Sequence, residues 1–177
     1  MAAPGGAGLG QNPAMQTQTF PIRPAEPRDL TAIVGLIREL ADFEQLTHLL
    51  QVDEERLRPH LFGPQPKAEA IVAEDDSGQV VAFALFFHNF STFLAQPGLY
   101  LEDLYVQPAH RGTGLGRQLL THLAQLAVAR GCGRFEWSVL DWNQRAIGFY
   151  EGMGATVMPD WRICRLSGEA LQALGKT

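Results

Sequence analysis

Residues 111–116 form a glycine-rich segment that could bind a phosphate group. Its glycines, at positions 112, 114 and 116, alternate with other residues between a predicted strand and a predicted helix. Without Cβ atoms, successive backbone N–H groups can converge at the start of a helix, where they attract phosphate without a lysine. The segment lacks the Gly-Lys-Ser/Thr ending of a Walker loop and the spacing of a dinucleotide fingerprint. A pyrophosphate site and a plain glycine-rich turn both remain open on these residues alone.

Two acidic residues, Glu102 and Asp103, interrupt a run that otherwise predicts an apolar strand over residues 99–106. Ionised side chains are costly to bury without partners. Adjacent residues of a regular strand point to opposite faces, so we expect at most one of these carboxylates to face a given side of a cleft. They are either functional groups or partly solvated carboxylates bonded to arginine or to backbone N–H groups.

Tyr150 and Asn143 lie seven residues apart on a short predicted helix, which places them on roughly the same side. The hydroxyl of Tyr150 can protonate a leaving group, although a tyrosine on an amphipathic helix commonly packs in a core instead. Two further residues could recognise an amine. The carboxylate of Glu44, at the end of the first predicted helix, can pair with a cation, and the indole of Trp161 can make a cation–π contact.

Hydrophobic periodicity and turn residues predict the elements that position these side chains. We expect turns at 75–78 and 96–98, and an α/β fold with a mixed sheet wrapped by helices. The expected elements are an edge strand over 19–23, a helix from 27–29 to 41, a short helix capped by Asp53 and ending before Gly63, strands over 70–74, 80–88 and 99–106, a helix over 114–130 ended by Gly131, a strand over 135–139, a short helix capped by Asn143, and strands over 155–157 and 162–166.

Length and composition predict one soluble domain. The chain has 177 residues, of which 46% are hydrophobic and 19% are charged, so we expect a single domain over 19–177 after a disordered tail over 1–18. We find no apolar run of ~20 residues and no basic-then-apolar start, which favours a cytoplasmic protein. Cys132 and Cys164 are not in a ligand-spaced cluster, so no metal site is expected. A net charge of −5 disfavours nucleic acid and anionic membranes and mildly favours a cationic small substrate.

Several motifs together resemble the GNAT N-acetyltransferase superfamily. Arg111-x-x-Gly114-x-Gly116, after Leu-Glu-Asp-Leu-Tyr-Val-Gln-Pro, is similar to its acyl-CoA motif. Val-Leu-Asp-Trp-Asn-Gln-Arg-Ala over 139–146, Phe149-Tyr150 and Gly154-Ala155 resemble the spermidine/spermine (diamine) acetyltransferase branch, most closely its thialysine N-epsilon-acetyltransferase-like members. The similarity covers roughly residues 20 to 172. It implies a mixed, mostly antiparallel sheet splayed between its fourth and fifth strands, flanked by helices, with acetyl-CoA in the splay.

The resemblance also implies roles for individual residues. Glu102 would be the general base, acting through water, and Asp103 would attract the cationic substrate. Tyr150 would protonate the departing coenzyme A, and neither cysteine sits in a motif that suggests an acyl-enzyme, so direct transfer in a ternary complex is expected. The amine pocket would include Glu44 and Trp161. The residues that would hold acetyl-CoA are Leu104, Tyr105, Val106, Arg111, Gly112, Thr113, Gly114, Leu115, Gly116, Arg117 and Asn143.

The expected function is therefore acetyl-CoA-dependent N-acetylation of a small lysine-like amine, diamine or polyamine by a homodimer, without a metal. The segment that follows Glu44, residues 45–48, carries less acid than polyamine enzymes of the branch commonly do. Two alternatives stay open. The same machinery could acetylate protein N-termini or lysine side chains, or the chain could be a catalytically silent CoA-binding sensor.

Overall fold

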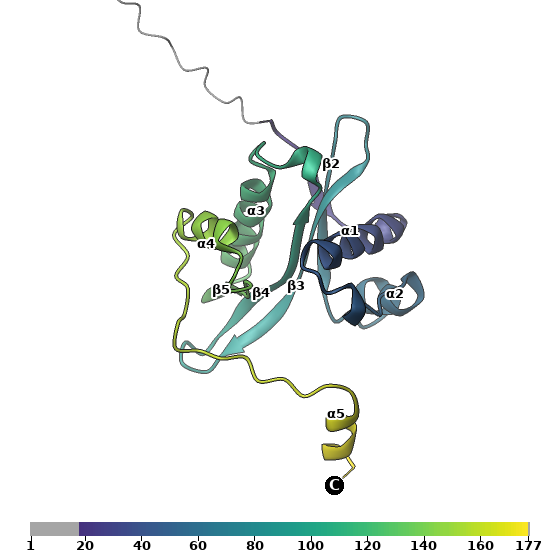
Figure 1. Ribbon diagram of the computed structural model, residues 1–177. Coiled ribbons are helices and arrows are strands. Elements are labelled where there is room, and N and C mark those ends of the chain that lie inside the picture. Colours follow the sequence, from purple (N-terminus) through teal and green to yellow (C-terminus); the bar gives the residue numbers. More distant parts are fainter. Residues whose placement is uncertain (1–17, 177) are drawn as a thin grey trace, which may run out of the picture. The chain divides into compact units, whose positions relative to one another are not determined.

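The computed structural model of the protein describes residues 18–176 (Figure 1). These residues divide into two compact units, one that ends at Ser138 and one that begins at Val139. The tail predicted over residues 1–18 lies outside the described residues, apart from Gln18. Among the described helices, none is long and apolar enough to cross a membrane.

The first unit is built on a five-stranded sheet whose strands lie side by side in chain order. Neighbouring strands are antiparallel except for the fourth and fifth, which are parallel. This arrangement confirms the predicted α/β fold with a mixed, mostly antiparallel sheet. The strands are β1 (Ile22–Pro24), β2 (Glu69–Glu74), β3 (Val80–Ser91), β4 (Gln96–Val106) and β5 (Arg134–Trp137).

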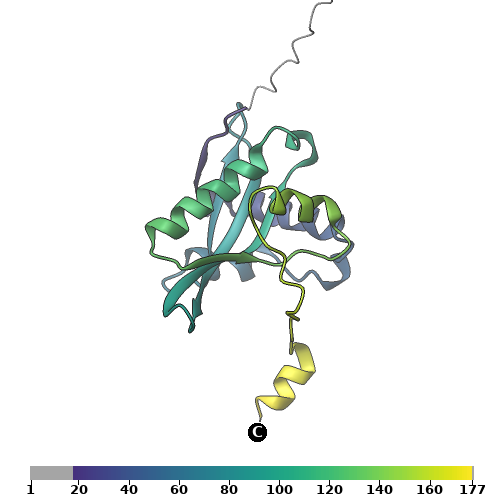
Figure 2. The same cartoon turned by 90° about the vertical axis from the view of Figure 1, so that its left-hand side faces the viewer.

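Helices cover both faces of this sheet. Helices α1 (Leu30–Phe43) and α2 (Glu54–Phe62) lie on one face and α3 (Leu115–Ala129) lies on the other, as Figures 1 and 2 show. The helical period of the apolar residues in α1 predicts which side of it is buried. That side meets alternating strand residues in one core, formed by Leu30, Ile33, Val34, Leu36, Leu61, Ala70, Val72, Phe83, Leu85 and Tyr105.

The helix ends follow the predicted capping residues. The Asp53 carboxylate accepts a hydrogen bond from the N–H of Arg56 at 2.8 Å at the start of α2. Beyond α3, Gly131 has a φ of 68°, the left-handed conformation that favours glycine. In the second unit, the Asn143 amide oxygen accepts from the N–H of Ala146 at 3.2 Å and so caps α4 (Gln144–Glu151). The prediction that Asn143 begins this helix is confirmed.

The turn predicted over residues 96–98 is wrong. These residues belong to β4 and pair with residues 89–91 of β3, and the chain reverses over 92–95, where Ala95 has a φ of 51°. Gly98 is a strand residue for a steric reason. A Cβ at this position would collide with the side-chain oxygen of Asn89 on the neighbouring strand. The glycine therefore reports a close approach between strands, not a turn.

The strands predicted over 155–157 and 162–166 are also absent. Residues 155–167 form no helix or strand, and a helix that was not predicted, α5 (Gly168–Leu174), follows them. Apolar side chains of this segment, such as Ile163 and Leu166, are exposed. A β-prone sequence becomes a strand only where a neighbouring strand accepts its backbone hydrogen bonds. The described residues supply no such neighbour to this segment.

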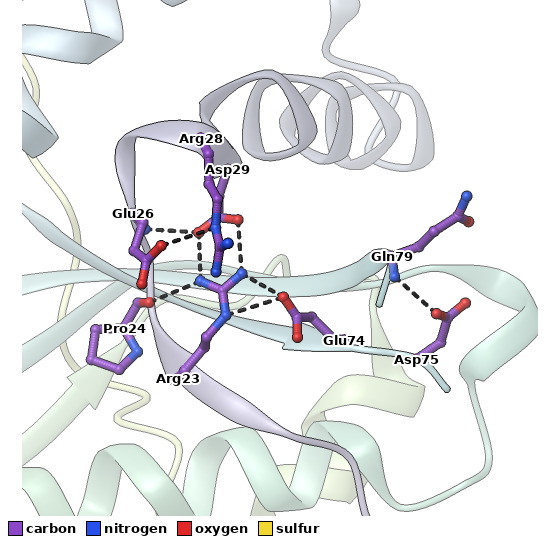
Figure 3. A network of polar contacts seen from close by, with 8 residues as sticks. All are labelled: Arg23, Pro24, Glu26, Arg28, Asp29, Glu74, Asp75 and Gln79. Carbon is purple, nitrogen blue, oxygen red and sulfur yellow. Dashed lines mark hydrogen bonds and ion pairs between the residues drawn. The ribbon is translucent and has the colours of Figure 1, made fainter. Parts of the chain in front are cut away.

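A partly buried ion-pair network, centred on the buried Asp29, joins the first strand to the start of α1. The guanidinium of Arg23 donates to both carboxylate oxygens of Asp29, at 2.6 and 2.9 Å, and to Glu74 at the end of β2 at 3.1 Å (Figure 3). The backbone N–H of Glu26 also donates to Asp29, at 2.7 Å. These bonds, the one to Arg23 above all, lower the pKa of Asp29 below its usual value. The network therefore fixes α1 to the edge of the sheet.

We predict that Arg23→Met destabilises the protein by about 3 kcal/mol at pH 7, because it leaves the buried Asp29 carboxylate without its cation. Because folding lowers the pKa of Asp29, its carboxylate stabilises the folded state at pH values above the unfolded-state pKa near 3.9. This stabilisation is lost as the pH falls through the folded-state pKa. The difference between variant and wild type should therefore shrink towards pH 3. Urea unfolding at both pH values measures it.

Arg28→Met is the matched control, since Arg28 pairs with Glu26 at the surface, where its side chain is 69% exposed. It should change stability by no more than about 0.5 kcal/mol. Equal losses in the two variants would contradict the role given to Arg23.

Candidate active site

The fifth strand pairs with only part of the fourth. Pairing runs from Gly98 opposite Arg134 to Leu101 opposite Trp137, where β5 ends. Residues 102–106 of β4 continue beyond this point, and in the described residues they pair with β3 alone. This confirms the predicted splay between the fourth and fifth strands. Backbone groups of residues 102–106 that point to the open edge need other hydrogen-bond partners, which a ligand can supply. The oxygen of Val106 already accepts a hydrogen bond from the Nε of Arg111.

A β-bulge coincides with the place where the strands part. Leu85 lies opposite Asp103 and Phe86 lies opposite Leu101, so Glu102 is an extra residue in β4. Directly opposed residues share a face, and consecutive residues on β3 face opposite ways. Asp103 is therefore on the face opposite to Leu101. Alternation from Leu101 puts Glu102 on that same face, so the expectation that the two carboxylates point to opposite faces is wrong.

The face that carries Asp103 is the one covered by α1 and α2, because Leu85 and Tyr105 belong to the core beneath those helices. Glu44, the residue at the C-terminal end of α1, lies close enough to interact electrostatically with Asp103, as does Glu102. Three of the predicted amine-site carboxylates thus gather on one side of the sheet.

Among the described residues, no basic side chain forms an ion pair with this cluster. Burial first, then the charges of Glu102 and Glu44, raise the pKa of Asp103 to about 6. Burial also raises the pKa of Glu44. Within residues 18–176, none of the ion pairs involves these three carboxylates. A cationic group placed beside them would be stabilised.

The glycine-rich segment leads directly into α3, and two of its glycines have left-handed conformations. Gly112 and Gly114 have φ values of 80° and 90°, which strain any residue with a side chain. The first helical N–H to find an acceptor is that of Gln118, which donates to the oxygen of Gly114 at 3.0 Å. In the described part of the chain, the backbone N–H groups of 112–117 donate to no protein acceptor, and the side-chain bonds of this loop are donated by Arg111 and Thr113. Six consecutive donors at the positive end of α3 suit an anion.

The side chain of Arg111 contacts β4 and the end of α1. Its Nε donates to the backbone oxygen of Val106 at 2.8 Å, and its guanidinium carbon lies 5.0 Å from the ring centre of Phe43 and 5.1 Å from that of Tyr105. Its own N–H donates to the oxygen of Pro108. The structure therefore ties Arg111 to the end of α1 and to β4.

Tyr150, Asn143 and Trp161 belong to the second unit. Asn143 caps α4, and Tyr150 is the last residue but one of that helix, partly buried with its ring centre 5.4 Å from that of Phe149. Trp161 lies in the segment without regular structure and is 71% exposed. Their roles with the amine and with acetyl-CoA stay predictions.

Sequence reasoning missed the bulge and the side chain of Phe43. A signal for the bulge exists in the residue types, because the aliphatic positions change from 99 and 101 to 104 and 106 along one strand. Such a change of phase is typical of one inserted residue. The contact of Phe43 with Arg111 has no comparable signal, since nearly seventy positions separate them.

No group of three or more His, Cys, Asp or Glu residues in 18–176 could hold a metal ion.

Comparisons with known proteins agree with this geometry. The model of the acetyltransferase (GNAT) family matches residues 36–155. The L-ornithine N5-acetyltransferase of Arabidopsis thaliana is 37% identical in an alignment of 199 positions that spans 88% of this chain and 87% of that protein. The thialysine N-epsilon-acetyltransferase of Mus musculus is 37% identical in an alignment of 163 positions that spans 86% of this chain and 95% of that protein. A solved integron cassette protein of V. cholerae has a TM-score of 0.75 and 26% identity, and the similarity covers 90% of this chain and 99% of that one.

We predict that Asp103→Asn stabilises the protein at pH 7.5 and has little effect at pH 4. Since the folded-state pKa of about 6 exceeds the unfolded value near 3.9, the wild type loses stability as the pH rises between these values. An asparagine does not titrate there. The gain should be about 1 to 2 kcal/mol, because partial exposure reduces the full effect.

Urea unfolding across this pH range measures the effect, with Asp76→Asn in the exposed β2–β3 turn as the control. A loss of stability at pH 7.5 in Asp103→Asn would show that the carboxylate is satisfied by the fold instead of being left for a ligand.

Proposed function

Because this chain belongs to the GNAT acetyltransferase family, and is therefore an acyltransferase, we propose that it acetylates a primary amine of a small lysine-like or diamine substrate with acetyl-CoA. The observation that carries the choice of substrate is the group of carboxylates without a cation at the bulge, beside the open edge of β4. The names of the two relatives, an ornithine and a thialysine acetyltransferase, support the same class of amine.

The chain's own residues fit acetyl-CoA at two places. The loop over 111–117, chiefly through the N–H groups of 112–117, would hold the pyrophosphate, because these donors have no acceptor among residues 18–176. The backbone of Leu104, Tyr105 and Val106 would bond the amide groups of the pantetheine arm, as an added strand does along an open edge. Asn143, at the start of α4, is proposed as a further contact.

The amine site would combine attraction with proton removal. An alkylamine with a pKa near 10.4 is mostly protonated at neutral pH, so Asp103 and Glu44 would bind it as a cation, with Trp161 as a proposed cation–π partner. Glu102, which is exposed, would accept one proton through water. The carboxylates thereby orient the nitrogen and free its lone pair.

The transfer forms the bond between the amine nitrogen and the acetyl carbon and breaks the bond between that carbon and sulfur. Tyr150 would donate its hydroxyl proton to the departing sulfur, and the second proton lost by the nitrogen would restore the hydroxyl through solvent. The products are then the N-acetylated amine and the free thiol of coenzyme A, with one proton released by Glu102.

Free-thiol release with thialysine, ornithine, lysine, diamines, spermidine and short peptides tests this proposal. We expect turnover with the small lysine-like amines or diamines and none with peptides. Turnover with peptides alone would favour the alternative of a protein acetyltransferase. Acetyl-CoA binding in calorimetry without turnover on any amine would favour the sensor.

We propose that the protein is a cytoplasmic homodimer, in which each subunit has a single catalytic domain over residues 19–177. This expectation comes from the family, and light scattering on the purified chain measures it. A monomer at micromolar concentration would contradict it.

Tyr150→Phe should lower kcat about 100-fold, because it removes the proposed proton donor, and should change the Kd of acetyl-CoA by less than twofold. Steady-state kinetics and calorimetry measure the two effects. Tyr100→Phe is the matched control, since the hydroxyl of Tyr100 shares a hydrogen bond with Ser138 and has no proposed part in the reaction. An unchanged kcat in Tyr150→Phe would remove this residue from the mechanism.

A further inference from the structure

The guanidinium of Arg111 connects the end of β4 with the end of α1. It bonds to the oxygen of Val106 at 2.8 Å and packs against the rings of Tyr105 and Phe43. Phe43 is the last residue of α1, directly before Glu44. Its ring is 44% exposed, so in the described residues only part of its surface is covered by neighbours such as Arg111. The contact of Arg111 with Phe43 therefore lies directly beside the turn that contains Glu44.

That turn has a conformation that the sequence alone does not favour. Gln45, directly after Glu44, has a φ of 60°, which costs a residue with a side chain of order 1 kcal/mol or more. The turn is closed by the N–H of Gln45 on the oxygen of Asp42 at 3.0 Å and by the N–H of Leu46 on that of Ala41 at 2.8 Å. Such a conformation persists only when its surroundings hold it.

A second contact joins the same two segments. The side-chain amide of Gln107, which follows β4, donates to the carboxylate of Glu39 on α1 at 3.0 Å. Glu39 lies one turn before Phe43, so the segment after β4 contacts α1 at two successive helical turns. Of these two contacts, the one made by Arg111 is next to Glu44.

We infer that Arg111 is a positioning residue of the amine site, which holds Phe43 and through it the carboxylate of Glu44. This inference rests on the proposed function in that Glu44 is taken to bind the amine. It assigns the side chain of Arg111 to the acceptor substrate, whereas the N–H groups of the same loop serve the pyrophosphate. One loop thus serves both substrates.

The test compares Arg111→Met, Phe43→Leu and the double variant, using the most active amine found in the thiol-release screen. Each single change should raise the KM for the amine about three- to tenfold, because a partly exposed cation–π contact and the order it imposes are lost. The kcat and the calorimetric Kd of acetyl-CoA should change by less than twofold in Phe43→Leu. The double variant should raise the KM no more than the worse single variant, since both changes break one contact.

Two variants separate this role from others. Arg58→Met, on the exposed side of α2, removes a positive charge elsewhere and should leave all three constants unchanged. Arg111→Lys retains a cation and should recover part of the amine KM. The inference is overturned if Arg111→Met weakens acetyl-CoA binding and leaves the amine KM unchanged, or if the two single effects multiply in the double variant.

Hydrogen exchange gives a readout that does not depend on activity. The amides of Gln45 and Leu46 should exchange at least threefold faster in Arg111→Met and in Phe43→Leu than in the wild type. The amide of Leu57, bonded to Asp53 in α2, should not change. If the wild type acetylates no amine but the two variants show this exchange pattern, the proposed function is wrong and the positioning contact is still supported. Unchanged exchange at Gln45 and Leu46 would defeat the inference.

Discussion

The separation of β5 from β4 after Leu101 is the constraint on which the rest of the first unit depends. Strand β4 pairs with a neighbour on both sides up to that residue, and beyond it β4 has an open edge. The extra residue at Glu102 falls at the same point, so the change in pairing and the change in side-chain alternation occur together. Backbone groups become available to a ligand at the place where acidic side chains are turned to one face.

This geometry separates two kinds of charge across the sheet. The carboxylates lie on the face of β4 covered by α1, whereas the free N–H groups stand at the start of α3, which covers the other face. On the proposed function, an anionic donor substrate and a cationic acceptor would be attracted to different sides of this one strand. The proposed pyrophosphate site is compatible with a net charge of −5, because its donors would be backbone dipoles and not side-chain charges.

Local rules worked where local interactions decide the structure. The caps at Asp53 and Asn143 and the end of α3 at Gly131 depend on side chains or dihedral angles within a few residues. The same rules failed at Gly98, because the reason for that glycine is the side chain of Asn89 on another strand. They failed again over 155–167, because strand formation needs a partner that periodicity within the segment does not reveal.

The amino-acid sequence by itself determined the chemistry at hand: a glycine-rich donor loop before a helix, two consecutive carboxylates in an apolar strand, and the order of the elements around them. The tertiary structure alone decided that Glu102 and Asp103 share a face and that Glu44 joins them. It also decided that Arg111 reaches Phe43. Pairing register and contacts between residues dozens of positions apart set these outcomes, and neither is encoded in the spacing of any single segment.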